Sequence, residues 1–581
     1  MTTEREAETV ETRQTTRRSF LKLGTKASGA LLAHPLLKST VTGASRSDRR
    51  TLLKNGLIVD GTGAEGVVGN VLIKGTKIEA VSPKPIDVDG ETIDCTGKVI
   101  APGFIDVHSH MDWVLPLPGH AELKSPFTAQ GCTTFVAGNC GNGIAGFRKN
   151  SKHKKRLNPG LFPEFDIAWD TMAEYFAHLR KVGMSHNLVN LVGHGTTRAS
   201  MRWHDPSPLS KSEMTELLAL LEQAMDEGAY GVSLGLQYSP GIFATPDEIK
   251  RVARLVRKKD KLLTVHARAY SAMDPSYEFK PFGTPHNVLA LQEMIDLARE
   301  TGVRVQYSHL MFAGTMSHAT YGRCLALLDK AIAEGIDIMI DTYPYHCGNT
   351  GITVVLPKWF REDLPANYHN LKAIKRLEAE LAAMTAVLGF GYDDIQITHA
   401  GHPDLNQYNG LFLSQIAKKR GTTPFETAID FAAKSSRRGS WVLLHKYSNM
   451  EIIDALMRHP ACLFMTDAVP AKWLRNPAAY GSFPLLLQYA RDRKLISLEQ
   501  AVRKMTGASA ERLRIKDRGF LKKGLAADVT VFDFKTVKDN TTLTDYDKPP
   551  TGIEAVFING KQVKKDGKVD GSANAGVVVR S

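Results

Sequence analysis

The sequence has little of what marks a small protein stapled by disulfides or by a zinc knuckle. Its 581 residues include only six cysteines, and no two of them form a C-x-x-C pair. A chain of this length buries enough apolar surface to need no cross-links. The cysteine spacing therefore excludes a structural zinc knuckle, while roles for single cysteines stay open.

Long apolar runs and focused charge are also missing. After residue 44 no segment has 18 consecutive apolar residues, so we expect no stable membrane span. The net charge is +13, but the lysines and arginines are scattered, with small clusters only at 151–156 and 254–261. Nucleic-acid binding needs a basic stripe, an aromatic platform or a known module, and none is present. We therefore expect solvated charged faces and no nucleic-acid partner.

The first 44 residues differ from the rest of the chain. Residues 16–22, TRRSFLK, resemble the twin-arginine (Tat) export signal, and a moderately apolar stretch follows them. That stretch is too short and too interrupted to stay in a bilayer. We expect the Tat export machinery to deliver the protein to the periplasm or the extracellular space, with a mature chain that starts near residue 45.

Two β-rich segments flank the remainder of the chain. Residues 45–98 contain short strand-like runs broken by Gly and Asn-Gly turns, and the same texture returns over 517–581. The pattern predicts one small β-sandwich built from both ends of the chain.

Strand-like runs alternate with helical stretches between these segments, an order typical of parallel β/α units. We count eight runs: 99–108, 133–139, 188–194, 229–236, 262–267, 304–309, 336–343 and 461–467. They predict an α/β fold, a TIM (β/α)8 barrel over 99–350 and 461–516. Residues 351–460 have strand-like pieces of their own and are predicted to form an insertion over the barrel mouth.

Metal-competent side chains stand at the predicted C-terminal ends of these strands. His108 and His110 are two residues apart, so on an extended strand both imidazoles point the same way. The other strand ends carry Asn139 with Cys140, His194, His266, His309 and Asp467. Because the C-terminal strand ends of a TIM barrel form its active site, we expect a catalytic metal centre there.

Some of these residues also have a simpler interpretation. Asp467 could cap a helix after the eighth strand. His194 could support a metal ligand from behind or contact the substrate, or it could be a turn residue beside two glycines. Cys347 and Cys462 are interpreted as core thiols, although Cys347 follows a strand end and could touch substrate.

The motif PGFIDVHSH (102–110), the flanking β segments and the late Asp467 resemble the amidohydrolase superfamily. Within it, GNCG (138–141), LVGHG (191–195) and DTYPY (341–345) are similar to the D-aminoacylase, or N-acyl-D-amino-acid deacylase, branch. The resemblance covers the chain from about residue 51 to its end. It implies hydrolysis of a C–N amide bond in a small-molecule substrate by a metal-activated water.

The resemblance also implies roles for single residues. Cys140 with His266 and His309 would hold one tight Zn²⁺, and His108 and His110, with Cys140 bridging, would form a second and weaker position. Thiolate and imidazole donors suit zinc. Asp467 would be the general base and acid.

The substrate pocket departs from the family pattern. D-aminoacylases hold the free α-carboxylate of their substrate with a lysine, a tyrosine, a serine and an arginine. At these positions the chain has Met311, Tyr343, Asn349 and Ala478, so both cations are gone. Each charge-assisted contact is worth about 1.5–3 kcal/mol. We therefore expect a substrate without a free α-carboxylate: a neutral amide, a cyclic amide or an ester.

Two alternatives follow from the same departures. Arg268, Lys472 or Arg475 could restore a cation from another direction, which would make the protein a conventional N-acyl-D-amino-acid deacylase. The second alternative is a non-catalytic exported metal-binding protein, because TDAVP (466–470) replaces the usual Ser-Asp-Gly motif. Retention of all five candidate ligands and of Asp467 argues against lost catalysis.

Overall fold

A computed structural model of the chain describes residues 49–157, 166–274, 276–278, 280, 283–435, 439–469, 476–543 and 545–581. The predicted export signal, Lys472 and Arg475 lie outside the described residues. Within the described ranges, no helix combines the length and the apolar character that crossing a membrane requires.

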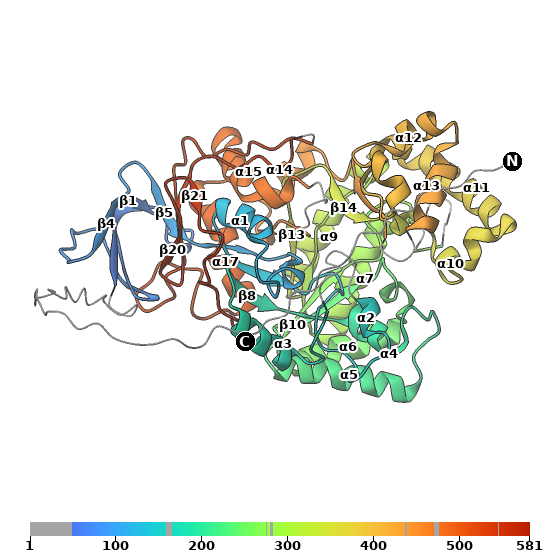
Figure 1. Cartoon of the computed structure of the whole chain (residues 1–581), viewed down its shortest axis with the longest axis horizontal. Helices are drawn as coiled ribbons and strands as arrows, with labels where there is room; N and C mark the ends of the chain where they lie inside the picture. Colours follow the sequence, from blue (N-terminus) through green and yellow to red (C-terminus); the bar gives the residue numbers. More distant parts are fainter. Residues whose placement is uncertain are drawn as a thin grey trace, which may run out of the picture. The chain divides into compact units, whose positions relative to one another are not determined.

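One sheet joins strands from the two ends of the chain. Strand β18 runs antiparallel to β5, with Val531 opposite Ile100, and the blue and red strands lie together in Figure 1. A small core of its own, including Leu53, Val71 and Phe557, packs on this sheet. The strands are β1 (Arg50–Ile58), β2 (Val67–Lys74), β3 (Lys77–Ser82), β4 (Glu91–Asp94), β5 (Val99–Pro102), β18 (Val529–Phe532), β19 (Ile553–Ile558), β20 (Lys561–Lys565) and β21 (Lys568–Val569).

The predicted barrel is confirmed by parallel strands in the expected order. These are β6 (Phe104–Asp106), β7 (Cys132–Ala137), β8 (Asn187–Asn190), β9 (Val192–Gly193), β10 (Gly231–Gly235), β11 (Leu262–His266), β12 (Arg304–Tyr307), β13 (Ile338–Thr342) and β17 (Cys462–Phe464). The ring closes just past β17, where the Asp467 N–H donates to the His108 carbonyl at 2.9 Å. Both faces of the strands are covered, which explains their continuous apolar runs.

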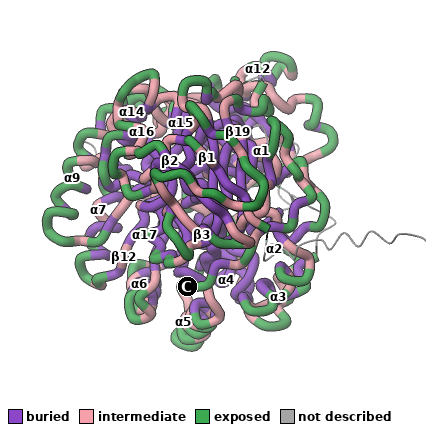
Figure 2. The backbone as a smooth tube through the Cα atoms, turned by 90° about the vertical axis from the view of Figure 1, so that its left-hand side faces the viewer, coloured by how far each residue is buried: buried purple, intermediate pink, exposed green. Residues whose placement is uncertain are grey.

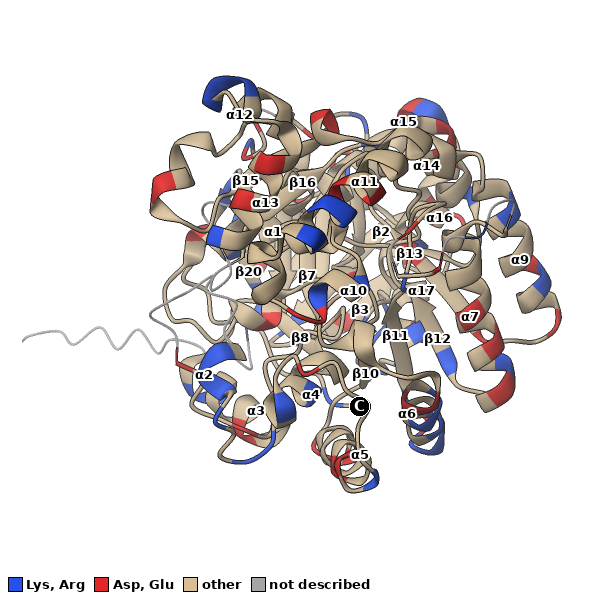
Figure 3. Ribbon diagram, turned by 90° about the vertical axis from the view of Figure 1, so that its right-hand side faces the viewer, with Lys and Arg blue, Asp and Glu red and all other residues tan. Residues whose placement is uncertain are grey.

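Helices surround these strands, and Figure 2 shows buried residues through the centre with exposed ones on the outer helices. The longer helices are α1 (Ala121–Ala129), α3 (Met172–Val182), α4 (His194–Arg202), α5 (Lys211–Asp226), α6 (Pro246–Lys258), α7 (His286–Thr301), α9 (Tyr321–Ala333), α14 (Met450–Arg458), α15 (Ala478–Arg493), α16 (Leu498–Met505) and α17 (Gly507–Leu513). Ser210 and Glu213 form a capping box that fixes the start of α5. Acidic and basic residues are mixed along the outer helices in Figure 3.

The segment between β13 and β17 forms a small subdomain next to the barrel (Figure 1). Its strands β14 (Gly348–Gly351), β15 (Ile395–His399) and β16 (Trp441–Leu444) pair antiparallel. Its helices are α10 (Lys358–Arg361), α11 (Leu371–Leu388), α12 (Leu413–Arg420) and α13 (Pro424–Lys434). Leu356, Phe360, Leu377 and Phe425 contribute to a separate core in this part of the chain. The strand-like pieces of the sequence here are thus real strands.

The first predicted barrel strand, 99–108, is in fact two strands in two sheets. Strand β5 pairs with β1 and β18, whereas β6 pairs with β7. The chain changes sheet at Gly103, where a Cβ atom would lie 2.3 Å from the side chain of Thr133. Pro102, the residue before it, has no backbone N–H to donate to a neighbouring strand. The change of sheet therefore comes a few residues later than the sequence pattern placed it.

We expect acid to destabilise the fold through His186. This side chain is fully buried, hydrogen bonds with Thr128 and Ser185, and burial lowers its pKa to about 3. In the unfolded chain this histidine has a pKa of ~6.5, so below that pH it binds a proton that the folded chain does not bind. The free energy of unfolding therefore falls as the pH drops below ~6.5. The slope from this residue is about 1.4 kcal/mol per pH unit, down to the folded pKa.

Chemical denaturation at pH 7 and pH 5 checks this expectation. His186→Gln should lose about 2 kcal/mol less stability between the two pH values than the parent does. His369→Gln, at an exposed histidine, serves as the matched control and should follow the parent. Equal losses in all three proteins would contradict the assignment.

Candidate metal centre

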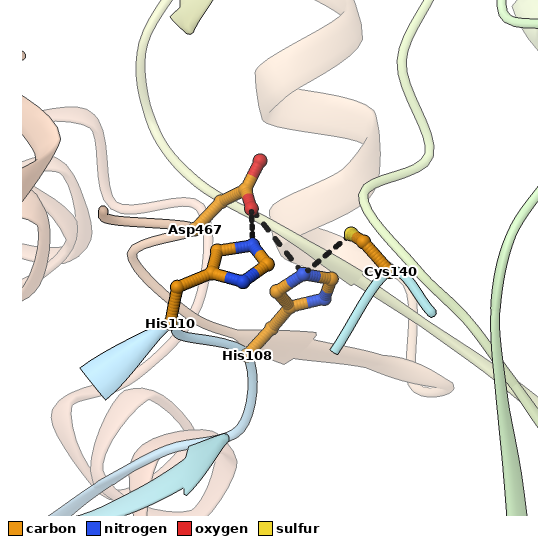
Figure 4. A group of neighbouring side chains, drawn as sticks. All are labelled: His108, His110, Cys140 and Asp467. Atoms are coloured by element: carbon orange, nitrogen blue, oxygen red, sulfur yellow. Dashed lines mark hydrogen bonds and ion pairs between the residues drawn. The ribbon is translucent and has the colours of Figure 1, made fainter. Parts of the chain in front are cut away.

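Six side chains converge at the C-terminal ends of the barrel strands, and Figure 4 shows four of them. Their candidate ligand atoms form two groups that share one cysteine, and within each group the atoms lie within 4.8 Å of one another. The first group is His108, His110, Cys140 and Asp467; the second is Cys140, His266 and His309. Five of these residues are buried and Asp467 is partly exposed. The structure thus brings together all five predicted ligands and the predicted general base.

The spacing of the donor atoms fits a zinc ion. The Cys140 Sγ atom lies 3.3 Å from His108 Nε2, 3.5 Å from His309 Nε2 and 3.7 Å from His266 Nδ1. A tetrahedral zinc with usual bond lengths places a sulfur and a nitrogen ligand about 3.5 Å apart. The residues present therefore match the group that the sequence predicts.

The electrostatics of the cluster favour the ligand forms of its members. Burial raises the pKa of the Cys140 thiol, but the neighbouring imidazoles, His108 foremost, hold the pKa well below its usual range. Burial and His309 lower the pKa of His266 to about 4. A thiolate and a neutral imidazole are the species that bind zinc.

Negative charge in the cluster also calls for a cation. Burial lowers the pKa of His110, but Asp467 and Cys140 outweigh this and raise the pKa to about 9. Two neighbouring anions, the buried Cys140 and the partly exposed Asp467, thus favour positive charge in the cluster. A divalent metal would supply that positive charge instead.

Strained turns aim three of these side chains at the centre. Cys140, His309 and Asp467 have φ values of 53°, 35° and 50°, in the left-handed region that residues with a Cβ atom rarely adopt. Each such residue costs roughly 1–3 kcal/mol, and they gather at functional sites. Gly235 packs against the turn at Cys140, where no larger residue fits, because a Cβ atom on it would lie 2.1 Å from the Cys140 carbonyl oxygen. The strain redirects side chains that would otherwise follow the strand.

Asp467 lies where a proton acceptor is needed. Its Oδ1 atom is 3.2 Å from His108 Nε2 and 3.5 Å from His110 Nε2, as the dashed lines in Figure 4 show. Burial raises its pKa, but the imidazoles of His309 and His108 hold the pKa well below its usual range. The side chain is 16% exposed, so an ionised carboxylate faces the open part of the site.

Two cavities open on the cluster, and each borders a different pair of candidate ligands. The first borders His266 and His309 and is walled by apolar side chains of the insertion: Val354, Val355, Leu381, Met384, Leu388 and Phe390. The second borders His110 and Cys140 and is lined by Trp113, Asn142, Leu157, Thr196, Trp441 and Val469. Tyr238, Asn349, Thr350 and Asp467 border both cavities. Among the described residues that line them, neither cavity has a lysine or an arginine.

Three predicted substrate-binding residues meet at the first cavity. Met311 and Asn349 line it, and the buried Tyr343 donates its O–H to the Met311 sulfur at 3.0 Å. Neither the Oδ1 nor the Nδ2 atom of Asn349 has a hydrogen-bond partner among the described residues, although both are buried. The Asn349 amide is thus free to hydrogen bond a ligand.

Two other predicted substrate-binding residues lie elsewhere. The Arg268 Nε atom is 3.0 Å from Glu293 Oε1, and the side chain lines neither cavity. His194 is the first residue of α4, and its Nε2 atom lies 2.8 Å from Glu248 on α6. Both side chains are held by acidic partners in the barrel wall, and neither lines the two cavities.

Sequence reasoning missed three residues that support the ligands. The Tyr238 O–H lies 2.5 Å from His266 Nδ1, and Gln237 Oε1 lies 3.0 Å from His266 Nε2. Asp341 accepts from the His309 backbone N–H at 2.6 Å, and its Oδ1 atom is 3.6 Å from His108 Nδ1. Gln237 and Tyr238 come two and three residues after the end of β10, so their position after a barrel strand was the signal in the sequence that could have found them.

Comparison with known proteins agrees with this geometry. The profile of the Amidohydrolase family matches residues 91–564. An N-acyl-D-glutamate deacylase of Alcaligenes xylosoxydans xylosoxydans is 30% identical over 515 residues, covering 88% of this chain and 92% of the relative. A D-aminoacylase structure from work on the role of its binuclear metal centre is 28% identical, with a TM-score of 0.76 over 91% of this chain and 99% of that one.

A further solved structure holds a metal and an inhibitor. The N-acyl-D-glutamate deacylase of Bordetella bronchiseptica, complexed with zinc and a phosphonate that mimics the tetrahedral intermediate, is 27% identical. Its TM-score is 0.75, over 92% of this chain and 100% of that one.

Proposed function

Because this chain belongs to the amidohydrolase family, we propose that its barrel mouth hydrolyses the C–N amide bond of a small N-acylated molecule with the help of zinc. The observation that carries the proposal is the buried cluster of one cysteine and four histidines, with Asp467 beside it and a cavity on either side. Relatives that deacylate N-acyl-D-amino acids support the reaction type.

The donor set suggests how zinc is held. Cys140, His266 and His309 would bind the tighter ion, and His108 and His110 would form a weaker second position that shares Cys140. Zinc held there would lower the pKa of a water molecule toward ~7 and would polarise the scissile carbonyl. The protein contributes a cluster that is buried except at Asp467, which excludes bulk water from the ligands.

Asp467 moves the proton in this proposal. Its ionised carboxylate accepts a proton from the attacking water and returns it to the leaving nitrogen. The carboxylate borders both cavities, so the scissile bond would lie beside it, with one half of the substrate in each cavity. The unpartnered amide of Asn349 on the same wall would hydrogen bond the substrate and orient it.

The lining of the cavities favours a substrate without a free carboxylate. A thioether, Met311, faces the first cavity, and the Tyr343 O–H points at its sulfur. The absence of both clamp cations removes contacts worth about 1.5–3 kcal/mol each, or roughly 10²- to 10⁴-fold in affinity together. A neutral amide, a cyclic amide or an ester therefore fits better than a free acid.

Paired substrates test the proposal. The zinc-loaded protein is offered N-acyl-D-amino acids and the matching carboxamides, and product release is followed by mass spectrometry. We expect kcat/KM to be at least tenfold higher for the carboxamides, since no cation among the described lining residues offsets burial of a carboxylate. A preference for the free acids would show a conventional deacylase with a cation from another direction, and no turnover of either would refute amide hydrolysis of this substrate class.

A further inference from the structure

A run of hydrogen bonds lies behind His266, on the side away from the other metal ligands. Gln237 Oε1 lies 3.0 Å from His266 Nε2, and Gln237 Nε2 donates to Asp274 Oδ2 at 2.7 Å. Arg361, the last residue of α10 in the insertion, donates its Nη1–H to the Gln237 backbone carbonyl at 2.7 Å. Asp274 and Arg361 are only 4% and 7% exposed, so water competes little for these bonds.

The donors and acceptors in this series of hydrogen bonds fix which nitrogen of His266 carries the hydrogen. An ionised carboxylate only accepts, so Asp274 fixes the NH₂ end of the Gln237 amide toward itself. The amide oxygen then faces His266, which must carry its hydrogen on Nε2. The lone pair is left on Nδ1, the nitrogen that faces Cys140 Sγ at 3.7 Å and His309 Nε2 at 2.9 Å.

Tyr238 supports the same tautomer from the other side of the ring. Its O–H lies 2.5 Å from His266 Nδ1, and a phenol donates only to a nitrogen that carries no hydrogen, so the lone pair that would bind zinc is the one that accepts from Tyr238 when zinc is not bound. His309 offers a contrast, because its far nitrogen, Nδ1, is buried without a hydrogen-bond partner in the described part of the chain. His266 is therefore the ligand whose orientation the surrounding side chains determine more fully.

We propose that Gln237 is a positioning residue of the metal centre: held by Asp274 and Arg361, it keeps His266 in the tautomer that presents Nδ1 to zinc. The inference rests on the metal site of the proposed function. It also gives the insertion a role in metal binding, since Arg361 ties α10 to the residue that orients a ligand. Groups that hydrogen bond a ligand from behind typically change metal affinity 10- to 100-fold when they are lost.

Zinc affinity, measured by competition with a chromogenic chelator, tests the inference. Gln237→Leu removes the acceptor behind His266 and should raise the zinc Kd roughly 10- to 100-fold. The double variant Gln237→Glu/Asp274→Asn keeps both contacts, since the new carboxylate accepts from His266 and from the new amide, and it should bind zinc more tightly than Gln237→Leu. The matched control is Gln396→Leu, because Gln396 Oε1 lies 3.2 Å from His445 Nε2, a pair of the same kind that belongs to neither metal group.

Spectra of the cobalt-loaded protein give a second readout. Gln237→Leu should shift the visible absorption bands of bound cobalt, while Gln396→Leu leaves them as in the parent. Parent-like zinc affinity and cobalt spectra in a folded Gln237→Leu protein would overturn the inference. If that variant does not fold, Asp274→Asn replaces it: this change frees the amide to turn, and unchanged zinc affinity there would be equally decisive.

The outcomes separate this inference from the proposed function. A parent protein that binds zinc but hydrolyses no amide would disprove the proposed reaction, and the zinc-affinity test of Gln237 would still apply. A hydrolytically active parent whose Gln237→Leu variant binds zinc normally would sink the inference alone.

Discussion

Replacing Asp467 by Asn is expected to lower kcat/KM roughly 10²- to 10⁴-fold while zinc stays bound, because the amide keeps the shape of the side chain but accepts no proton. In the folded chain the neighbouring imidazoles hold the pKa of Asp467 well below its usual range, so the parent carboxylate is ionised. Steady-state turnover, together with metal content by elemental analysis, measures both parts of this expectation.

A control for Asp467→Asn is available on the insertion. Asp430→Asn removes a carboxylate that pairs with Arg420 at 2.8 Å, in a contact that involves none of the candidate ligands. Its turnover should match that of the parent. If Asp467→Asn retained turnover within tenfold of the parent, another group would have to be the base, and the proton route proposed here would be wrong.

Cys140→Ala should cost the protein its zinc at both positions, because both groups of candidate ligands share this sulfur. The zinc Kd should rise by more than roughly 100-fold, which is the upper end for removal of a group that only hydrogen bonds a ligand. The rise is larger here because a bond to the metal itself is lost. Elemental analysis after dialysis and chelator competition provide the measurement.

The thiol at Cys324 gives the matching control. It is fully buried in α9, and its replacement by Ala removes the same atoms from the interior without touching the centre. Cys324→Ala should bind zinc as the parent does. Full zinc occupancy in Cys140→Ala would mean that the histidines alone hold the metal and that the bridging role is wrong.

The barrel could be predicted from the sequence because its signals are local. Each buried strand is a short apolar run between helical stretches, and the C-terminal ends of such strands meet at one face. Residues that directly follow a strand, such as His108, Cys140 and His309, therefore converge without any knowledge of long-range contacts. The change of sheet at Gly103 was missed because the apolar residues on both sides of Pro102 and Gly103 were treated as one strand.

The supporting residues could not be predicted in the same way. His194 also follows a strand, yet as the first residue of a helix it meets Glu248, which lies 54 residues later in the chain. Arg268 lies just after β11 and is paired with Glu293. Whether a polar side chain turns to the cavity or to a partner in the wall depends on such distant residues, and a single sequence does not show them.

The sheet made from both chain ends has a consequence for how the protein is synthesised. Strand β5 leaves the ribosome more than 400 residues before β18, the strand that pairs with it. Until translation is complete, β5 therefore has one unpaired edge, which is the kind of edge that joins to other chains. A product cut short before β18 would keep that edge open for good, so prematurely terminated or C-terminally degraded chains should aggregate even if their barrels have formed.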